Sequence, residues 1–148
     1  GTRAAIAYCS LNPERVISAA LYDASIGAAD VTAQRDGYKK ALELQIQSGI
    51  PRFDRPEGFN AHNTPDEVPA AMAAARKFDL PGAVPMLTMP VLVATGDHDP
   101  NLPSSKDLVE MAPDARLVVL GNVGHGSVMQ RPDLVVDVFL EFQVTLAN

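Results

Sequence analysis

The chain has 148 residues, of which 47% are hydrophobic and 20% are charged, a balance typical of one globular domain rather than a disordered tail. Its formal net charge of −6 argues against nucleic acid or an anionic membrane surface as a partner. No apolar run approaches the ~20 residues of a membrane-spanning helix, and the single cysteine, Cys9, excludes an internal disulfide framework and a multi-cysteine metal site. We therefore expect a soluble, acidic, cytoplasmic protein.

The first third of the sequence predicts a helix, a buried strand and a second helix. Residues 1–10 are rich in alanine and favour a helix that starts at the first residue, with nothing before it to cap its free N–H groups. We interpret this start as a sign that an upstream portion is missing. Residues 16–22 are almost continuously apolar, as in a strand buried on both faces of a parallel sheet. Apolar residues at four-residue spacing predict a helix over 31–48.

The middle of the chain reads as a loop followed by a helix. Residues 51–63 are rich in proline, glycine and charge, which predicts a loop. A capping-box pattern at residues 64–67 predicts the start of a helix that continues to Phe78. We interpret the whole stretch 26–88 as a cap-like helical insertion within a single, partial domain over 1–148.

The last third alternates regularly between strands and helices. Strands are predicted over 90–95 and 116–120, with a serine-capped helix over 104–111 between them. A glycine-rich turn over 121–126 leads to a final amphipathic helix that opens at Pro132. Strand–helix alternation of this kind requires parallel strands joined by crossover helices. The predicted class is therefore α/β, with three parallel strands.

Two loops carry residues suited to acid–base chemistry. Residues 96–100 and 121–126 each follow a predicted buried strand, at the edge where open α/β sheets place their ligands. Neighbouring parallel strands lie about 4.8 Å apart, so their carboxyl-end loops can bring a carboxylate and an imidazole together. Asp99 and His125 are 26 residues apart (125 − 99), which leaves room for one helix and one strand. A buried carboxylate on Nδ1 fixes the tautomer that makes a histidine a general base.

The succession of these motifs resembles the C-terminal portion of an α/β-hydrolase. In that family the order along the chain is nucleophile, acid, histidine. Stretches 90–99, 116–125 and 131–142 match the acid strand and loop, the histidine strand and turn, and the helix behind them. Residues 4–21 look like the helix that follows the nucleophile elbow, with the family's common "NPERV" entry to the next strand. The resemblance implies that the second aspartate of the loop, Asp99, is the catalytic acid and His125 the catalytic base.

One part of the family pattern is absent from the sequence. The nucleophile elbow has the form Gly-x-Ser-x-Gly, and no such pattern occurs here. Gly1 stands where the last glycine of the elbow belongs, so the resemblance places the nucleophile just upstream of residue 1. Because the members of a triad act as a unit, we do not expect this chain alone to run the family's reaction.

Other roles for the same residues stay open at this point. Asp23 follows the first predicted strand, from which some relatives draw their acid, so it is an alternative to Asp99. The carboxylates and imidazoles of 97–99 and His125 are also suitable metal ligands, but their spacing fits no compact metal motif. Ser127 lacks the flanking glycines of an elbow and is a poor nucleophile candidate. We expect no cofactor and no metal.

The resemblance implies a hydrolase that acts on a small, mostly apolar ester, lactone or related molecule. A serine nucleophile implies acyl transfer to water, and an aspartate implies a dehalogenase or an epoxide hydrolase. The apolar edge of the strand over 16–22 is expected to pair with a complementary N-terminal segment or with a second copy. The alternative from another class is a non-catalytic half-domain that binds a partner or ligand and is inactive on its own.

Overall fold

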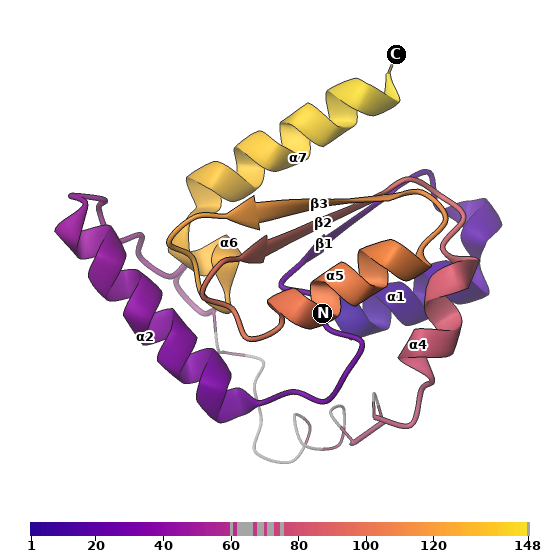
Figure 1. Ribbon diagram of the computed structural model, residues 1–148, viewed down its shortest axis with the longest axis horizontal. Helices are drawn as coiled ribbons and strands as arrows, with labels where there is room; N and C mark the ends of the chain where they lie inside the picture. Colours follow the sequence, from indigo (N-terminus) through magenta and orange to yellow (C-terminus); the bar gives the residue numbers. More distant parts are fainter. Residues whose placement is uncertain (60, 62–66, 68–69, 71–72, 75, 148) are drawn as a thin grey trace.

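Three parallel strands form the sheet at the centre of the fold. The computed structural model describes residues 1–59, 61, 67, 70, 73–74 and 76–147, and Figure 1 shows their arrangement. The strands are β1 (Ala19–Tyr22), β2 (Val91–Gly96) and β3 (Ala115–Leu120), in the order β1-β2-β3. Because β2 lies between the other two and is buried along its whole length, its residues are apolar or small, as the sequence pattern indicated.

The register brings the carboxyl ends of the strands to one edge of the sheet. Tyr22 pairs with Ala94, and Gly96 pairs with Leu120, with all pairs parallel. The backbone N–H of Asp23 donates to the carbonyl of Ala94 (2.9 Å), so the loop after β1 leaves the sheet at the same edge as the loops after β2 and β3. The residues that follow the three strands therefore converge.

Helices cover both faces of the sheet. Helices α1 (Thr2–Leu11), α5 (Leu102–Met111) and the short α4 (Leu80–Ala83) pack on one face, and α7 (Pro132–Leu146) packs on the other (Figure 1). Alternate strand residues point to the two faces. The larger core includes Ile6, Cys9, Leu21, Val91, Val93 and Leu108, and the smaller includes Ala94, Leu120, Val123 and Val135. The structure thus confirms the α/β fold class that the sequence predicted.

Helix α2 (Val31–Gln47) lies beyond the carboxyl ends of the strands rather than on a face of the sheet (Figure 1). Gly37 lets the helix approach closely, because a Cβ at this position would lie 2.0 Å from the carbonyl oxygen of His98. Short helices η1 (Pro13–Arg15), η2 (Val84–Met86) and α6 (Ser127–Gln130) complete the described elements.

Two local expectations from the sequence need correction. Strand β1 begins at Ala19 instead of residue 16, since the preceding residues extend beyond the start of its partner β2. The predicted serine cap of α5 is wrong: the helix begins at Leu102, and Ser104 Oγ instead accepts the N–H groups of Ile26 (3.0 Å) and Gly27 (3.3 Å). The helix predicted over 64–78 lies mostly outside the described residues, and the cap-like role of 26–88 stays a prediction.

Strand β1 forms one edge of the sheet. In the described part of the chain it pairs with β2 alone, and Ile17 just before it is 88% exposed. An apolar strand with one unpaired side can pair with another strand.

None of the described helices is long and apolar enough to cross a membrane.

Candidate active site

The loop after β2 holds a buried aspartate in a fixed turn. The N–H of Asp99 donates to the carbonyl of Gly96 (3.1 Å), and the N–H of Asn101 donates to Asp99 Oδ1 (2.8 Å). Asp99 is 3% exposed. A Cβ on Gly96 would lie 2.0 Å from the carbonyl oxygen of Val123, so this glycine lets the loops after β2 and β3 touch.

The loop after β3 needs left-handed backbone at two positions to present its histidine. Within residues 121–126, Asn122 has φ of 56° and Gly126 has φ of 92°. Asparagine and glycine are the residue types that adopt this conformation most readily. The N–H of Gly124 donates to Oε1 of Gln130 (2.7 Å), which ties the loop to α6. His125 projects from the end of this tightly bent segment.

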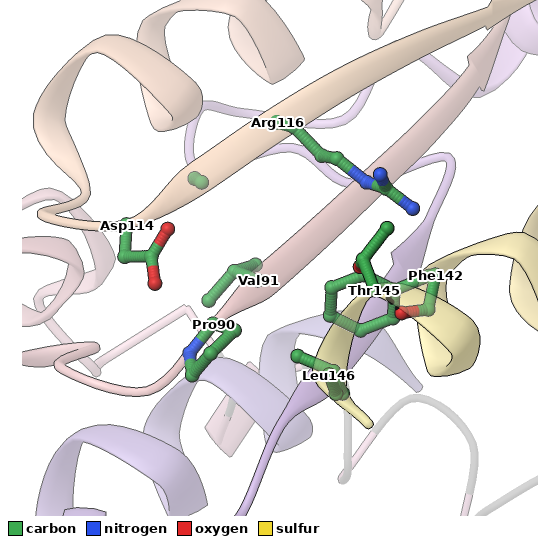
Figure 2. A pocket seen from close by; sticks show the side chains of 8 residues that line it. Pro90, Val91, Asp114, Arg116, Phe142, Thr145 and Leu146 are labelled. Carbon is green, nitrogen blue, oxygen red and sulfur yellow. Dashed lines mark hydrogen bonds between the residues drawn. The ribbon is translucent and has the colours of Figure 1, made fainter. Parts of the chain in front are cut away.

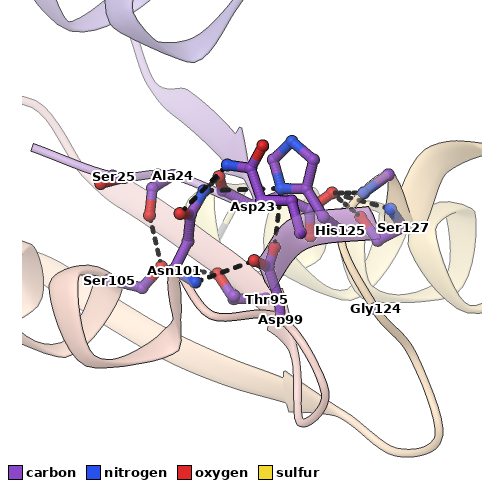
Figure 3. Close-up of polar contacts among 12 residues, drawn as sticks. Asp23, Ala24, Ser25, Thr95, Asp99, Asn101, Ser105, Gly124, His125 and Ser127 are labelled. Atoms are coloured by element: carbon purple, nitrogen blue, oxygen red, sulfur yellow. Dashed lines mark hydrogen bonds and ion pairs between the residues drawn. The ribbon is translucent and has the colours of Figure 1, made fainter. Parts of the chain in front are cut away.

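The two loops bring the imidazole of His125 against the carboxylate of Asp99. Nδ1 of His125 lies 3.1 Å from Oδ2 of Asp99, within hydrogen-bond distance (Figure 3). The Asp99 side chain is fully buried, and the His125 side chain is 36% exposed. An ionised aspartate only accepts, so Nδ1 carries the proton of this bond and Nε2 is left as the basic nitrogen. The bond to Asp99 is the main cause that raises the pKa of His125, against desolvation, which lowers it.

Asp23 lies beside this pair but binds the turn after the histidine. Its Oδ2 accepts the N–H of Gly126 (2.9 Å), the N–H of Ser127 (2.7 Å) and the hydroxyl of Ser127 (2.9 Å). Oδ1 is buried and has no hydrogen-bond partner. Desolvation raises the pKa of the Asp23 carboxyl to about 6; the charge of Asp99 acts in the same direction, and the bonds from Ser127 oppose it. Its backbone is left-handed, with φ of 53°.

A cleft of about 360 Å³ opens beside His125. Its walls combine residues from the first turns of α1 and α2 with polar groups from the loops that follow the strands. The lining residues include Gly1, Arg3, Asp23, Gln34, Asn101 and His125. Since ligands of open α/β sheets bind outside the carboxyl ends of the strands, this cleft is the candidate substrate site.

A second cavity, of about 280 Å³, lies at the opposite edge of the sheet. It is formed where β2 and β3 begin and where α7 ends, as Figure 2 shows. The guanidinium of Arg116 lies over the ring of Phe142, 5.0 Å from its centroid. This cavity contains neither the imidazole nor the paired carboxylates, so we place no chemistry there.

The same three side chains could in principle gather around a metal ion. The nearest ligand atoms of Asp23, Asp99 and His125 lie within 4.8 Å of one another. However, Asp99 Oδ2 is occupied by His125 Nδ1, and Asp23 Oδ2 accepts three protein hydrogen bonds. Three of the four carboxylate oxygens are therefore already used in hydrogen bonds within the protein, and only Asp23 Oδ1 is left, so we assign no metal to the cluster.

Solved structures with a similar chain trace give this arrangement a context. An esterase from Thermogutta terrifontis superposes with a TM-score of 0.68 at 20% identity over 99% of this chain and 62% of its own. MenH from S. aureus gives 0.61 at 16% identity, covering 100% and 66%, and the enol-lactonase from Burkholderia xenovorans LB400 gives 0.58 at 18%, covering 94% and 60%. No protein-family model and no curated protein sequence matches the chain.

The chain has the α/β-hydrolase fold. It spans less than two thirds of the length of the esterase and of the enol-lactonase, and corresponds to the C-terminal portion of the fold. In the α/β-hydrolase fold the acid precedes the histidine along the chain, and Asp99 precedes His125 here in the same order. The predicted proximity of these two residues is observed, while their catalytic role is a proposal, argued below.

Other candidates from the sequence fall elsewhere in the α/β-hydrolase fold. His98 points to Asp97 (3.8 Å) and is partly exposed, whereas Asp97 Oδ1 accepts the N–H of Val123 (3.1 Å) and links the two loops. Ser127 donates to Asp23. Asp23 does not contact Nδ1 of His125 in the way that Asp99 does. Of the two aspartates, Asp99 is the one whose carboxylate lies within hydrogen-bond distance of Nδ1 of His125.

Asn101 is the neighbour of the site that the sequence pattern missed. Its Nδ2 donates to the carbonyl of Asp23 (3.0 Å) and lies 3.5 Å from Nδ1 of His125, and its Oδ1 accepts from Gln34 (3.3 Å). It thus joins the loops after β1 and β2 to α2. Asn101 stands just before α5, where asparagine is common as a helix cap, but its side chain makes no cap bond, so the sequence held no signal for the contacts it makes.

Proposed function

We propose that this chain contributes the general base, His125, and its acid partner, Asp99, to a hydrolase of the α/β-hydrolase type. The substrate is a small, mostly apolar ester, lactone or related molecule. The observation that carries the proposal is the 3.1 Å bond between His125 Nδ1 and the buried Asp99, beside a cleft that His125 lines. The esterase and the enol-lactonase among the similar structures support this substrate class.

The geometry supports the following steps for an ester with a serine nucleophile. Nε2 of His125 accepts the hydroxyl proton as the oxygen attacks the ester carbonyl, and the imidazolium that forms is stabilised by Asp99. The same proton passes to the leaving alcohol when the ester C–O bond breaks, which leaves an acyl-enzyme. A water molecule then attacks the acyl group and gives its proton to Nε2. The bond between the acyl carbon and the serine oxygen breaks, the imidazolium returns the proton to that oxygen, and the acid product is released.

The nucleophile is proposed to come from a complementary segment. The sequence has no Gly-x-Ser-x-Gly elbow, and the hydroxyl of Ser127 already donates to Asp23. If the supplied nucleophile is an aspartate, His125 instead activates water for hydrolysis of an alkyl-enzyme ester, as in a dehalogenase or an epoxide hydrolase. The identity of this one group sets the reaction type.

The free side of β1 is the proposed place for that segment. Strand β1 is paired with β2 on one side only in the described residues, and exposed Ile17 precedes it. A strand added there extends the sheet next to α1, whose first turn lines the cleft. Self-association through the same edge is the other outcome, and size-exclusion chromatography with intact-mass analysis separates the two. The cytoplasmic location stays a prediction from the sequence.

The test compares two histidines in the complementing assembly. His125→Ala is expected to lower kcat/KM for a neutral 4-nitrophenyl ester by about 1,000-fold or more, because the base is lost. The matched control is His98→Ala, which removes a partly exposed imidazole from the neighbouring loop and is expected to change the rate by about twofold or less. Equal losses in the two variants would argue that folding, not catalysis, is affected.

A fluorophosphonate probe that labels a serine nucleophile supplies an independent readout. Labelling is expected only in the presence of the complementing segment and is expected to slow sharply in His125→Ala. Turnover without labelling indicates an aspartate nucleophile. Neither turnover nor labelling with any copurifying segment overturns the enzyme proposal and favours a binding half-domain.

A further inference from the structure

Asp23 adopts an uncommon backbone conformation that directs its side chain toward the turn carrying His125. The residue leaves β1 in left-handed backbone, which aspartate adopts more readily than most residues but which is still uncommon. Its backbone N–H stays bonded to Ala94, so the strand pairing continues while the side chain turns toward the loop after β3. The carboxylate thereby joins segments that are more than 100 residues apart in sequence.

The bonds of Asp23 fall on the two residues directly after the histidine. One oxygen, Oδ2, accepts from the N–H groups of Gly126 and Ser127 and from the Ser127 hydroxyl. Figure 3 shows Asp23 beside Ser127. Gly126 is left-handed and Ser127 opens α6, so these residues define the bend from which His125 projects. A carboxylate that binds successive N–H groups fixes the direction of the backbone at that bend.

The second oxygen, Oδ1, has a different environment. It is buried without a hydrogen-bond partner, which is uncommon for a carboxylate and costly unless another interaction compensates. A carboxylate oxygen of Asp23 lies within 4.8 Å of ligand atoms of Asp99 and His125, and Arg3 and Gly1 line the same cleft. The negative charge of Asp23 favours the imidazolium form of His125.

We propose that Asp23 is a positioning residue for His125. It fixes the bend that carries the imidazole and adds a second negative charge beside it, whereas Asp99 orients Nδ1. Asp99 thus sets the tautomer of the imidazole, and Asp23 sets the position of the ring. The effect on turnover rests on the proposed function, but the effect on the imidazole itself does not.

Two substitutions separate the hydrogen bonds of Asp23 from its charge. Asp23→Asn can place its amide oxygen at the Oδ2 position and keep the three bonds without the charge. Asp23→Gly removes both and avoids the strain that alanine has in left-handed backbone. Ser105→Ala is the matched control, because this buried hydroxyl donates to the carbonyl of Ala24, the next residue, and does not bond to the turn.

The measurement is NMR of the imidazoles in the 148-residue chain, which has three histidines. The downfield proton on His125 Nδ1 reports its bond to Asp99, and the titration of the ring reports its pKa. In Asp23→Asn we expect the downfield proton to persist and the pKa of His125 to fall. In Asp23→Gly we expect the same fall in pKa and, in addition, a broadened or lost downfield proton. Ser105→Ala is expected to match the unsubstituted chain in both readouts.

An unchanged pKa of His125 in Asp23→Asn overturns the proposal, whether or not Asp23→Gly folds. So does a sharp downfield proton in a folded Asp23→Gly. Neither readout requires turnover, so failure of the hydrolase proposal and failure of this one are distinguishable. In an active assembly, Asp23→Gly is expected to lower kcat by about tenfold or more with little change in KM, because the base is misplaced while the rest of the cleft is intact.

Discussion

Buried polar groups are bonded differently at the two ends of the strands, which we call the carboxyl edge and the amino edge of the sheet. At the carboxyl edge, Asp23 and Asp99 are almost completely buried, and nearly all of their oxygen atoms are bonded into a network that links three loops. At the amino edge, Arg116 stacks on Phe142 and its Nε is buried without a hydrogen-bond partner, but no second titratable group is bonded to it in the described residues. Both edges contain a cavity, so a cavity alone does not distinguish them.

The backbone shows the same difference. Residues at the carboxyl edge adopt left-handed conformations at Asp23 and Asn122, although neither is a glycine. Such conformations cost of order 1–3 kcal/mol each and persist where the surrounding structure over-determines them. Buried carboxylates and left-handed backbone, both energetically unfavourable, occur together at the carboxyl edge. Such a coincidence is typical of a functional site.

Helix α2 adds a further difference, because among the described residues its hydrogen bonds to other elements reach the carboxyl edge. Gln45 donates to the carbonyl of Asn122 (2.7 Å), and Gln130 donates to the carbonyl of Tyr38 (3.1 Å). A Cβ on Gly124 would lie 2.6 Å from the carbonyl oxygen of Gly37, so the helix backbone touches the histidine loop directly. Movement of α2 therefore changes the loop that carries His125.

The largest stability effect is expected from Gly37→Ala, which pushes α2 away from the loop after β2. The new methyl group would lie 2.0 Å from the carbonyl oxygen of His98, and overpacking of this kind costs about 3 kcal/mol. The higher helix propensity of alanine returns only about 1 kcal/mol. We expect the free energy of unfolding in urea to fall by about 2 kcal/mol or more.

The control for Gly37→Ala is Gly121→Ala, in the histidine loop itself. No heavy atom outside its chain neighbours lies within 4 Å of a Cβ there. Its unfolding free energy is expected to change by about 0.5 kcal/mol or less. A Gly37→Ala variant as stable as this control would show that α2 is not held against the loops.

A smaller effect, with a defined pH dependence, is expected from Asp23→Asn. The pKa of Asp23 is raised from 3.8 to about 6, so between these values the folded protein binds the proton more tightly than the unfolded chain. Stability from this group is therefore complete below about pH 4 and is lost as the pH rises through about 6, by up to about 3 kcal/mol. The raised pKa of His125 acts in the same direction.

Asp23→Asn removes the Asp23 part of that loss. The variant is expected to be more stable than the unsubstituted chain by about 2 kcal/mol at about pH 7.5, and nearly equal to it at about pH 4. Urea unfolding at the two pH values measures the difference. A variant that is less stable at both values would mean that the three bonds to the turn require the charge.

The elements that the sequence predicted correctly are those whose pattern reports burial. Continuous apolar runs identified β2 and β3, and the polar loops that follow them gave the pair Asp99 and His125. Parallel strands force neighbouring loops together, so order along the chain was sufficient to predict this proximity.

The sequence does not predict which hydrogen-bond partner a side chain has when that partner is distant along the chain. Ser104 is of a residue type common at helix caps, yet its hydroxyl accepts hydrogen bonds from backbone N–H groups of the loop after β1. Asp23 was an alternative acid on the basis of its position at a strand end, but its bonds go to the residues after His125. Spacing along the chain specifies where a side chain begins, whereas tertiary packing decides which donors it meets.

The smallest effect is expected at the amino edge, from Arg116→Met. Methionine keeps the apolar contact with Phe142 and removes the buried Nε that has no partner, so the lost cation–π attraction and the relieved desolvation nearly offset each other. We expect unfolding in urea to shift by about 1 kcal/mol or less and the pKa of His125, followed by NMR, to stay unchanged. A change in the His125 titration would couple the two edges and contradict the division between them, because Arg116 lies at the far end of β3 from the histidine loop.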